Sequence, residues 1–150
     1  CGKDHGFMPV VVDVRSPEDY AAWLGEKKAE AAKLAELTSK EWTLEELVAR
    51  GEKVYQTTCV ACHQASGEGM PPTFPALKGS PITTADIEAH LDIVVNGKPG
   101  TSMAAFGKQL SEVDLAAVIT YERNAWGNNT GEMVTPKDVL DFKQAEEATQ

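Results

Sequence analysis

The chain contains the run Cys59-Val60-Ala61-Cys62-His63, and this feature restricts its possible folds most strongly. On a helix the two thiols stand about one turn apart, and the imidazole of His63 follows directly. Thiols at this spacing can add to the two vinyl groups along one edge of a porphyrin, and the histidine can then swing under the ring to the iron. C-x-x-C-H is the attachment signature of c-type haem. It predicts one covalent haem on Cys59 and Cys62, with His63 as an axial iron ligand.

Two other uses of a cysteine pair fit the sequence less well. A structural zinc site needs four ligands, and the sequence contains no second Cys pair. A thioredoxin-like redox pair needs a βαβ context, whereas this pair follows a predicted helix. The remaining cysteine is Cys1, and an odd count of three is a poor basis for a disulfide framework.

Capping residues and apolar spacing predict helices on both sides of the motif. Thr43, followed three residues later by Glu46, forms a capping box for a helix that runs to about the cysteine pair. Ser16-Pro17 starts a helix that continues into an Ala/Glu/Lys-rich spacer. Later helix starts are predicted at Thr83 or Thr84, at Ser111, which leads to an end near Trp126-Gly127, and at Thr135-Pro136; residues 64–82 and 97–110 are predicted loops.

The charge balance limits the partners. Fourteen Lys and Arg stand against 23 Asp and Glu, which gives a formal net charge of −9. Phosphate binding needs a basic surface, so we expect neither nucleic acid nor an anionic membrane surface as a partner. No apolar run is long enough to span a bilayer and no signal peptide is seen, so we expect a processed or excised chain.

Residues 43–128 resemble a class I monohaem cytochrome c. The resemblance rests on Gly51-x-x-x-Tyr55-x-x-x-Cys59, on Phe74-Pro75-Ala76-Leu77-Lys78-Gly79, on a late loop with a methionine and on Tyr121-Glu122-Arg123-Asn124. It implies an all-α fold in which the first and last helices cross at Gly51, with Tyr121 packed in the crossing. It also implies that the Pro75 carbonyl accepts a hydrogen bond from His63 and so fixes the imidazole.

Four methionines compete for the second axial position. Met8 and Met133 lie outside the predicted core helices, and Met70 lies in the loop that wraps the histidine side of the haem in this family. Met103 lies in a loop of small residues between two predicted helices and can cover the opposite face, so it is the predicted ligand. His90, at the edge of its helix's apolar stripe, is the rival, and its ligation would lower the potential because Met/His ligation raises it.

The first nine residues form a second informative segment. Cys1, His5 and Met8 are soft and borderline ligands that suit copper. The run is similar to the end of the binuclear copper motif in subunit II of haem–copper cytochrome c oxidases, some of which carry a fused c-type cytochrome. The resemblance implies that Cys1 is a bridging cysteine, that His5 and Met8 are copper ligands, and that residues 10–14 are the last cupredoxin strand. Two bridging cysteines are needed, so binuclear copper is expected only in a full-length parent subunit.

These resemblances predict four parts of the chain. Residues 1–15 are the remnant of the copper-site end with its strand, residues 16–42 are a helical spacer, residues 43–128 are the cytochrome c domain, and residues 129–150 are a C-terminal helix and polar tail. The expected fold is therefore all-α, a class I cytochrome c fold around one haem, preceded by a residual cupredoxin strand and the spacer.

The expected function is one-electron transfer by haem c toward the binuclear copper centre of a respiratory oxidase, on the periplasmic side of the bacterial inner membrane. The expected partners are other oxidase subunits and an upstream donor, either cytochrome c or quinol–cytochrome c reductase. Membrane association would come only through N-terminal anchors outside this sequence. The domain itself is an electron carrier, whereas the parent complex would be a proton-translocating oxidase.

Two other classes stay open. Cys1-Gly2 is also how a mature bacterial lipoprotein begins, which would make the chain a free or lipid-anchored periplasmic monohaem carrier, although lipidation does not explain the residues from His5 to Pro9. A haem enzyme of the peroxidase kind would need an open iron position. A methionine–iron charge-transfer band in the spectrum would remove that option.

Overall fold

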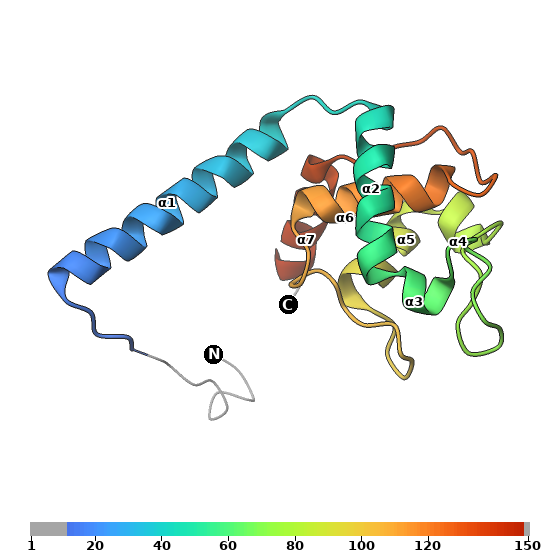
Figure 1. The fold of residues 1–150 in the computed structure, drawn as a ribbon, viewed down its shortest axis with the longest axis horizontal. Helices are drawn as coiled ribbons and strands as arrows, with labels where there is room; N and C mark the ends of the chain where they lie inside the picture. Colours follow the sequence, from blue (N-terminus) through green and yellow to red (C-terminus); the bar gives the residue numbers. More distant parts are fainter. Residues whose placement is uncertain (1–11, 149–150) are drawn as a thin grey trace. The chain divides into compact units, whose positions relative to one another are not determined.

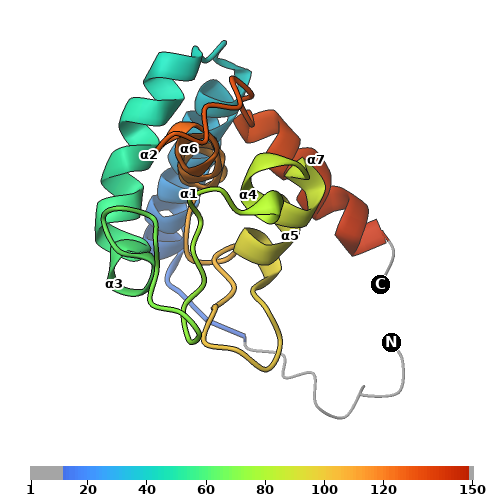
Figure 2. The same cartoon turned by 90° about the vertical axis from the view of Figure 1, so that its right-hand side faces the viewer.

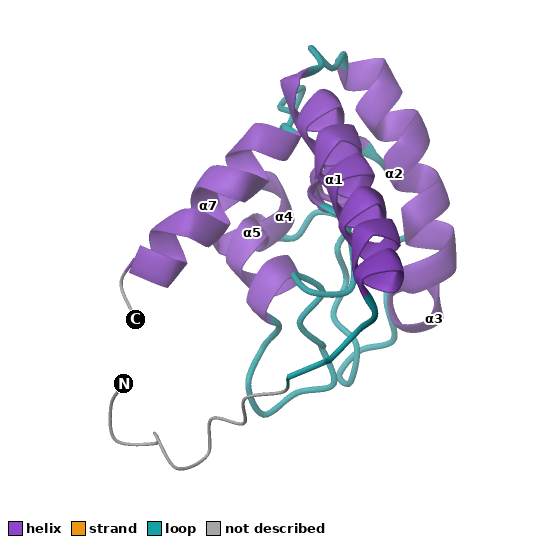
Figure 3. Ribbon diagram, turned by 90° about the vertical axis from the view of Figure 1, so that its left-hand side faces the viewer, coloured by secondary structure: helices purple, strands orange, loops and turns teal. Residues whose placement is uncertain are grey.

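Helices form all the regular secondary structure of residues 12–148, the part of the chain that the computed structural model describes (Figure 1). The elements are α1 (Pro17–Ser39), α2 (Leu44–Thr58), α3 (Val60–His63), α4 (Pro81–Thr84), α5 (Ile87–Asn96), α6 (Glu112–Asn124) and α7 (Pro136–Ala148). Figure 3, which colours the chain by secondary structure, draws no strand in this range. The predicted all-α fold is confirmed. The chain divides into two compact units between Ala35 and Glu36.

The N-terminal unit contains most of α1. Its predicted start is confirmed, because the Ser16 hydroxyl accepts a hydrogen bond from the Asp19 amide at 3.1 Å and Pro17 occupies the first turn. The strand predicted over residues 10–14 lies partly outside the described residues. Its described part is irregular, with Val12 and Val14 exposed to 77% and 87%. A strand needs a neighbour for its backbone hydrogen bonds, and residues 12–148 provide none. None of the helices in this range has the length and apolar character of a membrane span.

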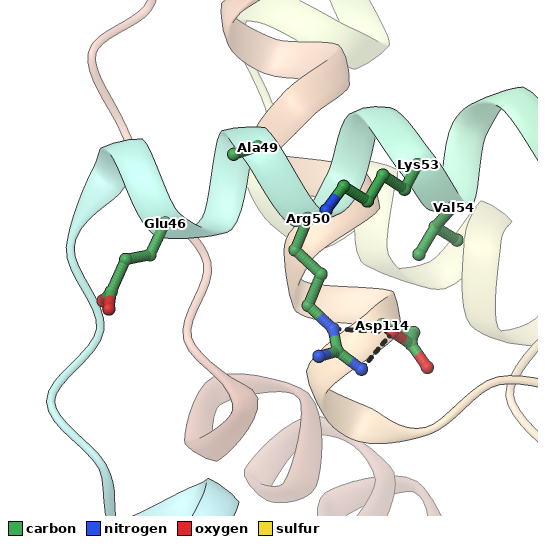
Figure 4. A pocket seen from close by; sticks show the side chains of 6 residues that line it. All are labelled: Glu46, Ala49, Arg50, Lys53, Val54 and Asp114. Atoms are coloured by element: carbon green, nitrogen blue, oxygen red, sulfur yellow. Dashed lines mark hydrogen bonds and ion pairs between the residues drawn. The ribbon is translucent and has the colours of Figure 1, made fainter.

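The second unit is built on the crossing of α2 and α6. A Cβ on Gly51 of α2 would lie 2.0 Å from the carbonyl oxygen of Ala117 on α6, so only glycine permits this approach. It would also lie 2.6 Å from the Cβ of Tyr121, which packs in the crossing. The predicted crossing at Gly51 is confirmed. At the surface the two helices are joined by Arg50 and Asp114, whose Nε and Oδ1 atoms lie 2.8 Å apart at the edge of a pocket (Figure 4).

Local capping explains where most of these helices start. Thr43 and Glu46 form the predicted capping box of α2, and Ser111 caps α6 by accepting from the Asp114 amide at 3.2 Å. The predicted start of α5 was wrong. Its N-cap is Asp86, which accepts from the Ala89 amide at 3.0 Å, while Thr83 and Thr84 belong to the separate turn α4. Pro81 starts that turn, and the extended backbone of Asp86 separates it from α5.

Helix α7 and the segment before it are part of the core. Val134 and Val139 are buried against α6 and its neighbours. The Thr120 hydroxyl accepts from the Val134 amide at 2.9 Å and donates to the Val134 carbonyl at 3.2 Å. Arg123, fully buried on α6, donates to the Thr83 carbonyl at 2.9 Å and pairs with Glu132. Residues 132–142 therefore extend the core, because they cover α6 in addition to the other helices packed on it.

Candidate haem-attachment site

The structure places the two thiols and the imidazole of the motif on one short turn. Cys59 ends α2, and its amide donates to the Tyr55 carbonyl at 2.9 Å. The chain then continues as α3, whose last residue, His63, donates its amide to the Cys59 carbonyl at 3.0 Å. Cys59 and Cys62 are both free thiols, half-buried on the same turn. The spacing of the motif predicts that these three residues lie close together. The backbone hydrogen bonds of the turn hold them there.

The imidazole of His63 is held in one orientation. The residue is 8% exposed, and Nδ1 lies 3.0 Å from the Pro75 carbonyl oxygen. A carbonyl can only accept, so Nδ1 carries the proton and Nε2 has an available lone pair. This is the pair of groups that the family resemblance implies, and their role toward iron stays a prediction. A histidine fixed in this way is prepared for binding a metal through Nε2.

The loop after His63 closes around it through backbone contacts. The Gly69 amide donates to the His63 carbonyl at 3.0 Å, and the Gly67 carbonyl accepts from the amides of Leu77 and Lys78 at 2.8 and 3.0 Å. These bonds bring Pro75 back toward the imidazole. The loop and α3 lie at one end of the helical body, together with residues 97–110 (Figures 1 and 2).

Three aromatic rings hold the motif from the side of the helix crossing. Tyr55, Tyr121 and Trp126 contact one another with ring centroids 4.9 to 5.4 Å apart. The Tyr55 hydroxyl donates to the Gln64 carbonyl at 2.6 Å, and the Trp126 indole donates to the Ala65 carbonyl at 2.9 Å. Sequence reasoning treated the tyrosines as core residues and did not assign Trp126 a role. The cluster connects the helix crossing to the backbone next to His63.

The surroundings of Cys59 keep its thiol protonated. Burial raises the pKa of Cys59 well above the ordinary value, and the charge of Glu122 on α6 raises it further. A redox-active thiol pair of the thioredoxin kind requires a lowered pKa instead. The structure therefore gives Cys59 the properties of a structural thiol rather than of a redox nucleophile.

Met103 lies in a loop that is attached to α5. The amides of Phe106 and Gly107 donate to Val94 and Val95 at 3.0 and 2.9 Å. Within the loop, the Met103 carbonyl accepts from the Lys98 amide at 3.1 Å. The Met103 side chain is half-buried and packs against the core. Its assignment as an iron ligand stays a prediction.

The other predicted ligands have different surroundings. Met70 and Met133 are exposed to 43% and 39%. His90 is buried, and its Nε2 lies 2.8 Å from a carboxylate oxygen of Glu122, which leaves only Nδ1 for another partner. The predicted copper ligands Cys1 and His5, together with Met8, lie outside the described residues.

The donor set fits haem c better than a bare metal ion. It consists of two unpaired thiols one turn apart, an imidazole with one nitrogen fixed, and a half-buried thioether in a loop at the same end of the domain. In residues 12–148, no group of three or more His, Cys, Asp or Glu side chains could hold a metal ion by itself. The surface pocket of Figure 4 contains neither a thiol nor an imidazole.

Comparison with known proteins agrees with this assignment. Residues 46–121 match the family described as "Cytochrome C oxidase, cbb3-type, subunit III". The chain is 32% identical over 99 residues to the cytochrome c subunit of a quinone alcohol dehydrogenase from Gluconobacter oxydans, covering 59% of this chain and 21% of that protein. It is 31% identical over 107 residues to the gluconate 2-dehydrogenase cytochrome c subunit of Pantoea cypripedii, covering 64% and 24%.

A smaller relative is matched over most of its length. The chain is 35% identical over 66 residues to cytochrome c-554(548) from Halomonas halodenitrificans, covering 43% of this chain and 80% of that protein. By contrast, the chain spans less than a quarter of the length of the two dehydrogenase subunits. The shared part is therefore of the size of one small cytochrome.

Proposed function

Because the chain belongs to the cbb3-type cytochrome c family, with class I c-type cytochromes among its relatives, we propose that it carries single electrons on one covalent haem c. Cys59 and Cys62 hold the haem, His63 is one axial ligand and Met103 is the other. When bound, haem c supplies the exchange of one electron at iron, and no substrate bond is made or broken.

The observation that carries this proposal is the 3.0 Å contact between His63 Nδ1 and the Pro75 carbonyl oxygen. It fixes the tautomer that leaves Nε2 ready to bind iron, and it sets the ring plane. His63 is only 8% exposed, which limits water at this ligand. The aromatic cluster of Tyr55, Tyr121 and Trp126 holds the backbone on either side of the turn in place.

The destination of the electron is the finer part of the proposal. The run Cys1, His5, Met8 supports a place at the end of subunit II of a haem–copper oxidase, where the haem passes electrons to a binuclear copper centre. In that setting the partners are the other oxidase subunits and an upstream donor, on the periplasmic side of the inner membrane. Copper would be held only by an intact parent subunit, since two bridging cysteines are needed.

The second candidate is a cytochrome c carrier outside an oxidase. Two relatives are cytochrome c subunits of dehydrogenases, and a third is a small cytochrome, so either setting is consistent with the same haem domain. The residues that precede Cys1 in the gene distinguish these settings. A cysteine four residues upstream supports the oxidase, and its absence supports the carrier.

Production in the periplasm with the haem-attachment machinery tests the central proposal. The purified chain should carry one haem by mass and give a reversible one-electron reduction by spectroelectrochemistry. The Cys59→Ala, Cys62→Ala double variant is the matched control and should carry no covalent haem. A wild-type chain without covalent haem under these conditions would overturn the proposal.

A further inference from the structure

A buried polar pair lies next to the motif and takes no part in the proposed haem attachment. Glu122 on α6 is 4% exposed and His90 on α5 is 2% exposed. Oε2 of Glu122 lies 2.8 Å from Nε2 of His90. Burying such a pair is costly compared with apolar residues of similar size, so it does not serve as a simple packing element.

The hydrogen bonds define the tautomer of His90. Its Nδ1 is buried and has no hydrogen-bond partner among the described residues. Nδ1 would carry a proton in the imidazolium and in the other neutral tautomer. Either form would bury an N–H group without an acceptor, which costs more than burying an unpaired lone pair. The remaining arrangement donates Nε2–H to Oε2 of Glu122 and leaves only a lone pair at Nδ1, so His90 itself carries no charge. A carboxylate is the stronger acceptor for this bond, and with a carboxylate the pair carries one net negative charge.

The carboxylate of the pair lies near Cys59. Burial raises the pKa of the Cys59 thiol most, and the charge of Glu122 raises it further, so the carboxylate is close enough to act on a haem-attachment residue. Burial raises the pKa of Tyr55 on α2 and of Tyr121 on α6 most, and the charge of Glu122 contributes to both shifts, after that of Glu52 in the case of Tyr121. Among the ion pairs of residues 12–148, Glu122 pairs with His90 alone, and no lysine or arginine neutralises it.

We propose that Glu122, held in place by His90, lowers the reduction potential of the haem that Cys59 attaches. This inference depends on the proposed function, because it needs a covalent haem. Oxidised iron carries one more positive charge than reduced iron, so a fixed negative charge nearby favours the oxidised form. For one buried charge near a one-electron centre we expect about a tenfold effect on the ratio of reduced to oxidised protein, which is about 59 mV.

Spectroelectrochemical titration of the haem-loaded protein tests this inference. Glu122→Gln keeps an acceptor for His90 and removes the charge, so the potential should rise by about 59 mV, which is tenfold. Glu52→Gln removes an exposed carboxylate from α2 and is the matched control, with an expected change of less than about twofold because water screens the charge. His90→Gln removes no charge and should also stay within about twofold, with unchanged absorption of the axial ligands.

The outcomes separate this inference from the proposed function. A wild-type chain without a reversible haem signal would overturn the proposed function and this inference with it. A normal wild type in which Glu122→Gln changes the potential no more than Glu52→Gln overturns the inference alone. A changed axial spectrum in His90→Gln would make His90 an iron ligand and would overturn its role in holding Glu122.

A measurement on the wild type covers the case in which Glu122→Gln does not fold. Nitrogen-15 NMR of the reduced protein reports which imidazole nitrogen of His90 carries a proton. We expect the neutral Nε2–H tautomer. Protons on both nitrogens would make the pair electrically neutral and would overturn the inference without any variant.

Discussion

The two loops at the motif end of the domain are held in different ways. Residues 64–80 are bound by the Tyr55 hydroxyl from α2 and by the indole of Trp126 beyond α6, and they fold back on the Gly67 carbonyl. In residues 97–110, the backbone hydrogen bonds that reach outside the loop go to α5 alone, from the amides of Gly97, Phe106 and Gly107. Hydrogen bonds therefore hold the histidine side through several elements and the methionine side through one.

This difference indicates which of the two proposed axial ligands can be exchanged. His63 lies on a turn whose neighbours are fixed by two crossing helices, so its position depends on the core of the domain. Met103 is half-buried in a loop that can move with the end of α5. We therefore expect changes on the histidine side to cost stability, and changes on the methionine side to alter the chemistry of the iron with a smaller loss of stability. The predictions below test this contrast, from the largest effect on stability to the smallest.

The largest loss is expected when the haem is not attached. Cys59→Ala with Cys62→Ala should leave a largely unfolded chain, because a small domain with long loops has a thin apolar core and the haem supplies much of its interior. Circular dichroism and thermal unfolding measure this. A cooperative, helical chain without haem would contradict the prediction and would mean that both loops are ordered by the protein alone.

A single backbone change should weaken the histidine side. Gly69 has a φ of +63°, and a Cβ there would lie 2.5 Å from the Pro75 carbonyl oxygen that holds His63. Gly69→Ala should lower the free energy of unfolding by about 2 to 4 kcal/mol, from left-handed strain and from displaced backbone.

The matched control for this change is Gly79→Ala. Gly79 has a similar φ of +68° and open space around it, so strain alone should cost about 1 kcal/mol. Chemical denaturation of the haem-loaded proteins compares the two variants. Equal losses would mean that the close approach of residue 69 to the Pro75 carbonyl has no effect on stability.

On the methionine side we expect a change in iron chemistry with less loss of stability. Met103→Ala should keep the haem attached through Cys59 and Cys62, lower the potential and let the iron bind small ligands, at a stability cost of about 1 to 2 kcal/mol for a half-buried side chain. Absorption spectra and redox titration measure this. If Met103→Ala leaves both unchanged while His90→Ala alters them, the assignment of Met103 is wrong.

The smallest effect on stability is expected at the surface that both loops border. Around the proposed haem edge lie Ala61, Met70, Ala104 and Ala105, all exposed and apolar, and the nearby Glu68 is paired with Lys78 at 3.0 Å. A small apolar patch with few unpaired charges suits brief encounters with a redox partner. Transfer rates with the donor should therefore depend only weakly on salt.

Charge-insertion variants measure where the donor docks. Ala105→Glu or Ala61→Glu should slow electron transfer more than changing Glu45, Glu46 or Glu52 on α2 to Gln. A Gln at position 46 can still accept from the Thr43 amide, so stability should stay within about 0.5 kcal/mol. Stopped-flow kinetics at several salt concentrations makes the comparison. A steep salt dependence that disappears when the α2 glutamates are neutralised would mean that the partner docks on that helix.

Much of the fold follows from short-range patterns in the sequence. The predicted starts of α2 and α6 were correct, because a helix cap depends only on residues three apart in the sequence. The pairs are Thr43 with Glu46 and Ser111 with Asp114. The start of α5 was misassigned because two threonines compete with Asp86 within four residues, and Pro81 makes an extra turn that capping rules do not predict. Gly51 was located through a family resemblance, since the close approach of Ala117 depends on a distant helix.

The site could be predicted only as far as its contacts are local. The placement of Cys59, Cys62 and His63 on one turn follows from their spacing. The pairing of His90 with Glu122 joins residues 32 apart, and sequence reasoning did not find it. One signal existed: Glu122 lies four residues after Val118 on a helix whose residues are otherwise apolar on that side. A carboxylate on the buried side of a helix needs a buried hydrogen-bond partner.

The two hydrogen bonds between the Thr120 hydroxyl and the backbone of Val134 have a consequence for how this haem unit can be transferred between proteins. The family match ends at residue 121, inside α6, yet Val134 and Val139 cover that helix and Glu132 pairs with its buried Arg123. A gene fusion or a transplanted module that stopped at residue 128 would leave a guanidinium and an apolar strip facing water. The exchangeable unit is therefore longer than its recognisable signature, and it includes α7.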